Sequence, residues 1–483
     1  MTSLYTNAPE LFGELSLEIR LFTDERRIEQ TDCIKSEGMC IAHTSDESSG
    51  FFSEAVLYLD GVKASEGSVF LKNSAASVLE FKKYKKRAAK QSVYDCLKAY
   101  FQQNMPWGSL TGIRPTKLFR QISNASGKDA ARAKFLREFF VSDEKTSLAE
   151  TICGVQQKII ASANTAEIDV YIGIPFCTTK CAYCSFSSGL TSKNGELERR
   201  YVDALIREIE LMKPVFEKYP VRSLYIGGGT PTALEACQLA RVLACAGQLA
   251  SCAEEFTVEA GRPDTITADK LQLIKDAGAD RISVNAQTTC DRTLKRIGRA
   301  HTAADFFRAF ELAKGFGFHA VNTDIIAGLP GENAGDVENT LRDMIRVGAD
   351  NITVHTLAIK NGSKFAEENA RAFASGQEAE AMVGTARRLA CEAGYCPYYL
   401  YRQKYMAGNL ENVGYALPGK ECIYNIDIME ETMSVIALGA GGISKRLFAE
   451  QDKIERAANV KDIKNYVERT AEMANRKLEL FLR

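Results

Sequence analysis

The sequence has no long run of apolar residues. No stretch approaches the ~18 consecutive apolar residues that a membrane-spanning helix requires, so we expect no membrane span. Residues 1–20 carry acidic side chains where a signal peptide would be basic and then apolar. We therefore expect a cytoplasmic protein.

An excess of charge of either sign is also missing. Lys plus Arg total 61 and Asp plus Glu total 62, so the net charge is −1. This balance gives no overall reason to expect nucleic acid or an anionic membrane as a partner. Hydrophobic residues make up 45% of the chain and charged residues 25%, which is typical of a globular protein and not of a disordered one. The length of 483 residues predicts about three domains at roughly 150 residues each.

The middle of the chain, residues 166–395, alternates short β-rich runs with amphipathic helical stretches. Such units in succession predict a parallel sheet with right-handed crossovers. They are fewer than the roughly eight that close a barrel. We therefore expect an α/β fold, an open partial (β/α)6 barrel whose working face is the C-terminal end of its strands. The expected strands are 169–174, 222–227, 255–260, 280–285, 318–325 and 350–356, and helices are expected over 196–218 and 235–250.

Residues 1–165 have a different pattern of strand-like and helical segments, which predicts a separate N-terminal α+β domain. A small sheet is expected first, then a long helix over 75–104. The sheet is expected from alternating apolar segments around 13–22, 38–43 and 51–70.

Two features of this N-terminal domain have both a structural and a binding interpretation. The segment PWGSLTGIRPTKL (106–118) holds the only tryptophan and two basic residues, Arg114 and Lys117. It is a structural turn or part of a site. A basic cluster precedes it, which either solvates one helix face or forms a patch for an acidic ligand. This cluster consists of Lys82, Lys83, Lys85, Lys86, Arg87 and Lys90.

Residues 396–483 are expected to form a C-terminal extension on the substrate side of the barrel. It opens with CPYYLYRQKYMAGNLENVGYALPGKECIYN and later contains the Gly-rich segment ALGAGGISK (437–445). Such a glycine-rich turn either lets backbone approach a ligand or links strands.

Three of the fourteen cysteines carry most of the chemical information. The other eleven are scattered singly and are typical of reduced core residues. Cys177, Cys181 and Cys184 have the spacing C-x3-C-x2-C on one short loop after the first expected strand. Three thiolates on one loop favour an iron–sulfur cluster with one iron open to a small molecule. Zinc and three unrelated buried cysteines are the alternatives, but none of the four histidines is near and zinc sites normally add histidine or a second C-x2-C pair.

The stretch YIGIPFCTTKCAYCSF (171–186) resembles the signature of the radical S-adenosylmethionine (SAM) superfamily, and specifically its oxygen-independent coproporphyrinogen oxidase-like branch. GGGTPT (227–232), after the next strand, resembles the segment that in this branch lies against the methionine amino group of SAM. The whole chain resembles the HemZ-type coproporphyrinogen dehydrogenases, through PWGSLTGIRPTKL, Gly173, the tail YLYRQKYMAGNLENVGYA and ALGAGGISK.

This resemblance implies two cofactors and a set of residues that bind them. The cofactors are a [4Fe–4S] cluster, with Cys177, Cys181 and Cys184 as its ligands, and SAM. Carboxylates suit the ribose hydroxyls of SAM, and an arginine suits its carboxylate. Each position alone is also compatible with a salt bridge or cap at the barrel rim. The implied SAM contacts are Tyr171, Tyr183, Gly228, Gly229, Thr230, Glu259, Gln287, Arg299, Asp324 and Ala358, and Tyr171 is also the implied catalytic residue.

The reaction implied by the resemblance is oxidative decarboxylation of two propionates of coproporphyrinogen III to vinyl groups without O₂, in porphyrin and haem biosynthesis under anaerobic conditions. The partners implied are a porphyrinogen-type substrate and an unidentified electron donor. Two positions depart from well-established coproporphyrinogen oxidases, which have His where Gly173 stands and Cys where Phe186 stands. Two alternatives therefore stay open: a haem-binding chaperone, with His355 as the candidate axial ligand, and a radical SAM methyltransferase of the same branch.

Overall fold

The computed structural model describes residues 2–23, 25, 27–112, 114–186, 188–192, 195–359, 363–367, 375–403, 406–448, 451 and 453–483. Ile113 of the N-terminal motif and residues 404 and 405 of the tail motif lie outside this part. The chain forms two compact units, residues 1–150 with 408–410, and residues 151–407 with 411–483. The domain boundaries expected at 165 and 395 stay predictions. No helix in the described part is long and apolar enough to cross a membrane.

The first unit is built on a five-stranded sheet with the strand order β2-β1-β3-β4-β5. β3, β4 and β5 form an antiparallel meander, and β1 runs parallel to β2 and β3. The expected long helix is present as α2, which packs on β4 and β5. The strands are β1 (Thr2–Thr6), β2 (Glu29–Thr31), β3 (Met39–Asp46), β4 (Phe51–Leu59) and β5 (Val62–Leu71), and the helices are η1 (Pro9–Leu11), α1 (Phe12–Phe22), α2 (Val78–Phe101), α3 (Pro115–Ser126), α4 (Lys128–Arg137) and α5 (Asp143–Ala161), which continues into the second unit.

The expected strand over 13–22 is wrong, because this segment is the helix α1. Alternation of Leu15, Leu17, Ile19 and Leu21 fits a strand period, which misled the prediction. In the structure Leu15 and Ile19, four residues apart, are fully buried on one helix face, while Leu17 and Leu21 are half-buried. The buried pair joins the core between the helices and the sheet.

The second unit contains an 11-stranded sheet with the order β14-β15-β13-β12-β11-β10-β9-β6-β16-β17-β18. All six expected strands are present, and neighbours among them pair in parallel. β14 and β18 are the two edges of this sheet, so the barrel is partial and open, as expected. The six strands are β6 (Ile168–Ile174), β9 (Val221–Gly228), β10 (Glu255–Glu259), β11 (Arg281–Ser283), β12 (Ala320–Ala327) and β13 (Asn351–Thr356).

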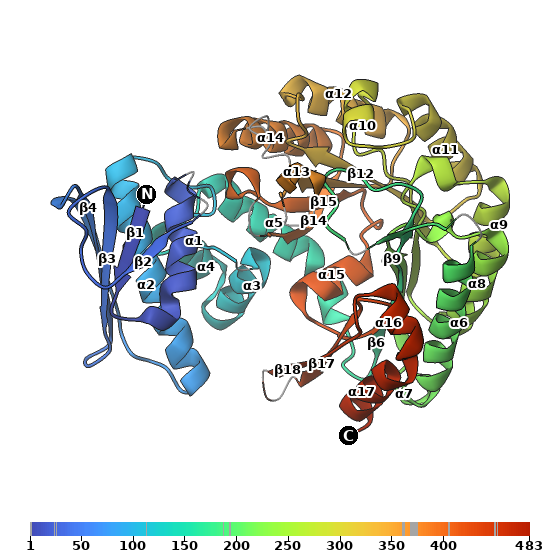
Figure 1. The fold of residues 1–483 in the computed structure, drawn as a ribbon, viewed down its shortest axis with the longest axis horizontal. Coiled ribbons are helices and arrows are strands. Elements are labelled where there is room, and N and C mark those ends of the chain that lie inside the picture. Colours follow the sequence, from blue (N-terminus) through green and yellow to red (C-terminus); the bar gives the residue numbers. More distant parts are fainter. Residues whose placement is uncertain are drawn as a thin grey trace. The chain divides into compact units, whose positions relative to one another are not determined.

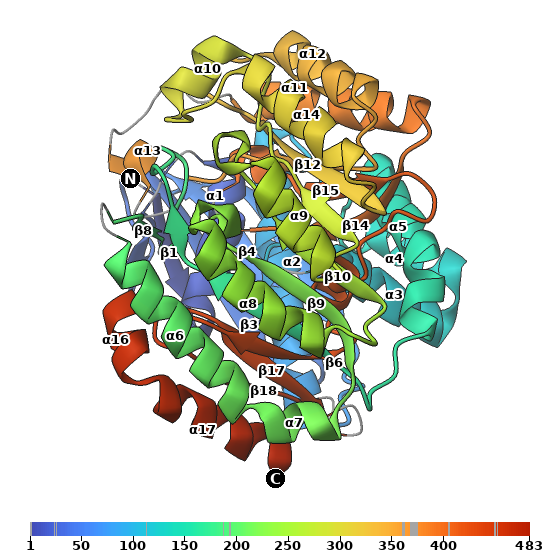
Figure 2. The same cartoon turned by 90° about the vertical axis from the view of Figure 1, so that its right-hand side faces the viewer.

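Helices of the second unit form an arc around the outside of these strands (Figure 1; Figure 2 shows the same arc from the side). The expected helix over 196–218 is divided at Met212, because Pro214 has no N–H to continue the helical ladder. The helices are α6 (Glu196–Leu211), α7 (Lys213–Lys218), η2 (Pro231–Ala233), α8 (Ala236–Leu249), η3 (Pro263–Thr265), α9 (Ala268–Asp276), α10 (Asp291–Arg296), α11 (Ala303–Gly315), α12 (Ala334–Arg346), α13 (Lys364–Glu367) and α14 (Gly376–Glu392).

Residues after 395 complete the barrel sheet at both of its ends. β14 and β15 add antiparallel strands beside β13, and β16 runs parallel to β6 at the other end. β16 is a parallel strand that the six-unit pattern did not include. The elements here are β14 (Cys396–Tyr401), η4 (Ala407–Asn409), β15 (Asn412–Ala416), α15 (Ile423–Glu430), β16 (Ser434–Leu438), β17 (Ile443–Phe448), β18 (Lys453–Ala458), α16 (Ile463–Glu468) and α17 (Thr470–Leu482).

A buried polar network attaches this C-terminal region to α6. Glu208 of α6 and Lys477 of α17 form an ion pair, and both side chains are almost fully buried. The Asn459 amide and the Tyr466 hydroxyl also donate to Glu208, at 2.8 and 2.7 Å. The backbone N–H of Gly439 adds a fourth donor at 2.8 Å. The buried carboxylate is thus fully paired. Since one of its donors is Gly439, the network holds the ALGAGGISK turn beside the end of β6.

Candidate functional site

The three clustered cysteines lie on one loop after the C-terminal end of β6. Cys177 ends the two-residue strand β7 (Phe176–Cys177), which pairs with β8 (Gly189–Leu190). The Cys184 N–H donates to the Cys181 carbonyl at 3.1 Å, which closes a tight turn. Burial raises the pKa of the Cys184 thiol, and the nearby Cys181 and Cys177 raise it further. The structure thus brings the three sulfur-bearing residues together at the predicted face of the barrel.

The glycine-rich segment after β9 packs directly against the cysteine loop. The Gly229 N–H donates to the Ile174 carbonyl at 2.8 Å, and the Thr230 N–H donates to the Phe176 carbonyl at 2.7 Å. A Cβ on Gly229 would lie 2.5 Å from the Phe176 oxygen. Gly228 has φ 111°, a conformation that favours glycine. Only glycine therefore lets these two loops approach so closely.

Glu259 ends β10 beside this glycine segment. Its Oε1 accepts a hydrogen bond from the Tyr225 hydroxyl at 2.5 Å, and its Oε2 accepts one from the Gly228 N–H at 3.3 Å. Burial raises the pKa of Glu259 to about 7, although the bond from Tyr225 lowers it. This carboxyl group is thus placed at the strand end with a protonation state that changes near neutral pH.

Arg299 lies between the cysteine loop and the turn after β10. Its guanidinium donates to the Tyr183 hydroxyl at 3.1 Å and to the Gly261 carbonyl at 3.4 Å. Its Nε is buried and has no hydrogen-bond partner among the described residues. A buried cationic donor without a partner is a site where an anionic group is stabilised.

Gln287, which follows β11, meets Asp324 of the neighbouring strand β12. Gln287 has φ 66°, and its N–H donates to the Asp324 carbonyl at 2.8 Å. The Asp324 carboxylate accepts from Asn322 at 3.0 Å and lies 3.6 Å from Nε2 of His355. Burial raises the pKa of Asp324, but the contacts with His355, Asn322 and Thr353 outweigh burial and lower it.

Tyr171 of β6 is part of a group of stacked aromatic rings. Its ring centroid lies 6.3 Å from that of Tyr225 and 6.4 Å from that of Tyr424 of α15. Burial raises the pKa of its hydroxyl, so Tyr171 is protonated at neutral pH. Ala358, the remaining predicted contact, forms an isolated antiparallel bridge with Met406 and lies one strand away from Asp324.

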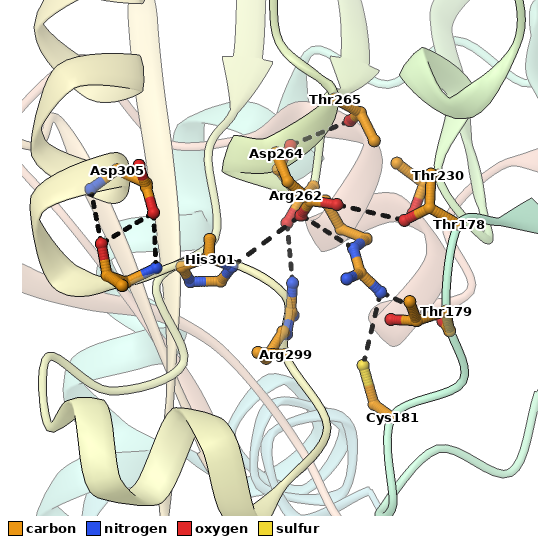
Figure 3. Close-up of polar contacts among 12 residues, drawn as sticks. Thr178, Thr179, Cys181, Thr230, Arg262, Asp264, Thr265, Arg299, His301 and Asp305 are labelled. Carbon is orange, nitrogen blue, oxygen red and sulfur yellow. Dashed lines mark hydrogen bonds and ion pairs between the residues drawn. The ribbon is translucent and has the colours of Figure 1, made fainter.

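Several residues near the cysteines were not identified from the sequence (Figure 3). Nη1 of Arg262 lies 3.9 Å from the Cys181 sulfur and donates to the Thr179 carbonyl at 3.0 Å. Asp264 accepts from Thr178 at 3.1 Å and from Nε of Arg262 at 3.1 Å, and it lies 3.9 Å from His301. The signal was available in the segment GRPD (261–264), which begins two residues after Glu259, the last residue of its strand.

Tyr401 of β14 was also missed. Its hydroxyl hydrogen-bonds to Nδ1 of His355 at 3.2 Å. It comes from the C-terminal region, so the local pattern of the barrel did not connect it to the strand ends.

The donor groups present fit the two cofactors that the sequence implies. Three thiols on one loop suit a cluster in which separate irons each take one thiolate. Beside them, the glycine segment has no side chains that would keep a cofactor away from its backbone, and the Nε atom of Arg299 is a buried donor without a partner among the described residues. In the described part, no three His, Cys, Asp or Glu side chains are grouped to hold a single metal ion.

The chain is similar to a superfamily model, to curated proteins and to a solved structure. A model of the radical SAM superfamily matches residues 171–344. The oxygen-independent coproporphyrinogen-III oxidase-like protein HemZ of Bacillus subtilis (strain 168) is 37% identical over 79% of this chain and 78% of its own length. The heme chaperone HemW of the same organism is 33% identical over 40% of this chain and 52% of its own. The solved structure of coproporphyrinogen III oxidase (HemN) from Escherichia coli, a radical SAM enzyme, has a TM-score of 0.52 at 22% identity and covers 67% of this chain and 73% of its own.

The open barrel, the cysteine loop and the matched region together define a radical SAM protein, whose superfamily uses a [4Fe–4S] cluster and SAM. At 37% identity over most of both sequences, the chain belongs to the family of oxygen-independent coproporphyrinogen-III oxidase-like proteins that includes HemZ. Both steps agree with the resemblance seen in the sequence.

Proposed function

We propose that this protein catalyses the oxygen-independent oxidative decarboxylation of coproporphyrinogen III to protoporphyrinogen IX. Each of two propionate side chains loses one hydrogen atom from its β-carbon, its carboxylate as CO₂ and one electron to an acceptor, and becomes a vinyl group. The observation that carries the proposal is the cysteine loop and glycine segment in contact at the open face of a barrel that resembles HemN. Membership of the HemZ family supports the choice of substrate. The electron donor and a cytoplasmic location stay predictions from the sequence.

In this proposal the site residues divide into two groups. Cys177, Cys181 and Cys184 are the ligands of the cluster. In the SAM site the backbone of the glycine segment lies against the methionine part of SAM. Carboxylates accept hydrogen bonds from its ribose hydroxyls, and a cation pairs with its carboxylate. These residues are Gly228, Gly229, Thr230, Glu259, Gln287, Arg299, Asp324 and Ala358, together with Tyr171 and Tyr183.

When bound, the cluster and SAM supply the one-electron chemistry that removes the hydrogen atom. The residues of this chain orient the reactants and exclude water. Arg299 holds an anionic group through its unpaired Nε, and Tyr183, its hydrogen-bond partner, keeps the guanidinium in place. The rings of Tyr171, Tyr225 and Tyr424 form an apolar wall whose protonated hydroxyls carry no charge into the site.

Gly173, where well-established coproporphyrinogen oxidases have histidine, packs closely against its neighbours. A Cβ on Gly173 would lie 3.3 Å from the Tyr171 ring and 3.4 Å from the Leu438 carbonyl. A side chain there would require the Tyr171 ring to shift slightly. We therefore propose Tyr171 as the catalytic side chain that contacts the reactants from the position left free by the missing histidine. At the other departure, Phe186 is 69% exposed.

The haem-carrier alternative depends on an axial ligand, and His355 was its candidate. In this structure Nδ1 of His355 bonds to the Tyr401 hydroxyl at 3.2 Å, and its Nε2 lies 3.6 Å from Asp324. Coordination of haem iron by either nitrogen would break one of these contacts. The contacts favour the enzyme over the carrier.

The test is an anaerobic assay of the full-length protein with its cluster reconstituted from iron and sulfide. SAM, a reductant and coproporphyrinogen III are added, and products are followed by mass spectrometry. We expect sequential loss of two CO₂ with one 5′-deoxyadenosine formed for each vinyl group. Cys181→Ala is the negative control, and Cys252→Ala, at an exposed cysteine, is the matched variant that keeps activity.

Other products would overturn the assignment in distinguishable ways. Formation of 5′-deoxyadenosine without any change in the porphyrinogen would mean a working radical SAM site with a different substrate. Addition of a methyl group would indicate the methyltransferase alternative. Stoichiometric haem binding that His355→Ala abolishes, without any turnover, would indicate the carrier.

A further inference from the structure

The first unit contains a cavity of about 540 Å³ that the proposed reaction does not use. Its volume lies in the range of roughly 300–1,000 Å³ typical of sites for small organic ligands. It brings together the two features that the sequence left open, the basic cluster and the PWGSLTGIRPTKL motif. The lining residues come from α2, from the turn before α3, from α3 itself and from Phe139.

The lining of this cavity is strongly cationic. It includes seven basic side chains and no acidic one among the described residues, namely Lys82, Lys83, Lys86, Arg87, Lys90, Arg114 and Lys117. Lys86 is paired with Glu14 at 2.5 Å, and Lys90 is paired with Glu18 at 3.0 Å. Like charges three and four residues apart on one helix face repel each other, so the arrangement on α2 favours an anion beside it.

Arg87 is the basic residue most specifically placed for an anionic ligand. Its guanidinium lies 4.9 Å from the centre of the Phe139 ring and makes no ion pair within the described part. Burial lowers the pKa of Arg87, because it removes water from the charged group. An anion in the cavity would replace that lost solvation. Lys82 and Lys83, which are exposed, lie about one turn before it on the same helix and also lack an ion pair in the described ranges.

The tryptophan motif holds the aromatic wall of the cavity in place. Gly108 has φ 51°, and a Cβ there would lie 1.9 Å from the Phe139 carbonyl oxygen. The Ser109 N–H donates to the same carbonyl at 2.9 Å, and Trp107 is fully buried. The turn at the start of the motif therefore positions Phe139, and Arg114 and Lys117, later in the same motif, line the same cavity.

The remaining walls indicate an occupant with an apolar body. Leu79, Leu110, Leu118 and Phe139 are apolar lining residues. Gln91, also in the lining and only 3% exposed, has an Oε1 atom with no hydrogen-bond partner among the described residues, so it is available to an N–H donor. A simple inorganic anion would satisfy the charges but leave this apolar surface in contact with water.

We propose that this cavity binds an amphipathic organic polyanion, and specifically a carboxylated tetrapyrrole. The apolar ring system of such a molecule matches the leucine and phenylalanine walls. Its pyrrole N–H groups can donate to Gln91, and its carboxylates can pair with the basic side chains. The choice of tetrapyrrole rests on the proposed function. A nucleotide also carries anionic groups on a flat organic ring system. The experiment must therefore distinguish a nucleotide from a tetrapyrrole as the ligand.

The experiment measures binding of coproporphyrin III, the stable oxidised form, to the full-length Cys181→Ala protein by fluorescence, with ATP as the competing probe. This protein lacks a complete set of cluster ligands, so binding is measured apart from turnover. We expect the double variant Lys83→Gln/Arg87→Gln to weaken binding at this site tenfold or more, and added salt to weaken binding to the unsubstituted cavity. Lys72→Gln, on the same unit but outside the cavity, is the matched control and is expected to bind as before.

Three results would overturn the proposal. Equal affinity in the double variant and its parent would remove the cavity as the site, provided that circular dichroism shows both to be folded. Binding of ATP without coproporphyrin would replace the tetrapyrrole with a nucleotide. Loss of coproporphyrin binding in Tyr171→Ala, with binding unchanged in the double variant, would assign all binding to the barrel. Failure of the proposed function appears separately, as absence of vinyl product while coproporphyrin binding still responds to Lys83 and Arg87.

Discussion

The Tyr225 hydroxyl and the Glu259 carboxyl group are joined by a 2.5 Å hydrogen bond across two adjacent parallel strands. Burial raises the pKa of Glu259 from its ordinary value of 4.5 to about 7. Between these two pH values the folded protein holds a proton that the unfolded chain has lost. The stabilising contribution of Glu259 is therefore complete below about pH 4.5 and is lost as the pH rises through about 7.

Glu259→Gln is expected to remove this pH dependence. The amide cannot ionise, so the fall in the free energy of unfolding, at most about 1.4 kcal/mol per pH unit in the wild type, should flatten between pH 5 and 7. Urea unfolding of the cluster-free protein at several pH values measures it. Glu311→Gln, at an exposed position, should leave the slope unchanged. A slope that is the same in the wild type and Glu259→Gln would show that Glu259 titrates normally.

Replacement of any one of Cys177, Cys181 and Cys184 by alanine is expected to abolish the stable cluster. Each of the three thiolates holds a different iron, so the loss of one leaves a second iron without a protein ligand and the cube is no longer held. Iron and sulfide content and visible absorption after anaerobic reconstitution report the loss. Cys252→Ala removes an exposed thiol and should retain the full cluster. A variant of the three that kept wild-type iron content would not be a ligand.

Arg299→Ala is expected to weaken SAM binding while the cluster survives. A hydrogen bond to a charged group contributes roughly 1.5–3 kcal/mol, which corresponds to a Kd raised about tenfold to one hundredfold. Anaerobic titration calorimetry with SAM measures the change. Arg308→Ala, at an exposed arginine of α11 paired with Asp305, is the matched control. An unchanged Kd would place the SAM carboxylate elsewhere.

Gly229→Ala is expected to damage both stability and SAM binding. The added Cβ would lie 2.5 Å from the Phe176 oxygen and 2.9 Å from its nitrogen, so the cysteine loop must move. We expect a loss of about 1–3 kcal/mol of unfolding free energy. In contrast, Gly384→Ala in α14 meets no atom within 4 Å and should stabilise its helix by roughly 0.5–1 kcal/mol. Thermal unfolding and SAM titration compare the two; equal behaviour would mean that the two loops separate easily.

Much of the candidate site was predictable because its geometry is local or periodic. Cys177, Cys181 and Cys184 are close in the chain, so one loop must carry them together. Glu259 is the last residue of β10 and Asp324 lies in the C-terminal half of β12, and the C-terminal ends of parallel strands meet at one face of the sheet. For these residues the spacing in the sequence already implies proximity in space.

Contacts between distant segments required the tertiary structure. β16 lies beside β6, although more than two hundred residues separate them, and no local pattern specifies that pairing. The same is true of Arg262 beside Cys181, and of Lys477 paired with Glu208. Residues 13–22 fit both a strand and a helix period, and packing against α2 decided in favour of the helix.

By itself, the sequence determined the barrel strands and the cysteine loop, because hydrophobic periodicity and residue spacing act over a few residues. Its resemblance to a known signature indicated the superfamily and the two cofactors. Only the tertiary structure decided that the basic cluster of α2 and the tryptophan motif line one cavity, and that the C-terminal region completes the barrel sheet. The physical reason is that pairing between distant segments depends on the free energy of burying many surfaces together. The sequence of one short segment does not determine that free energy.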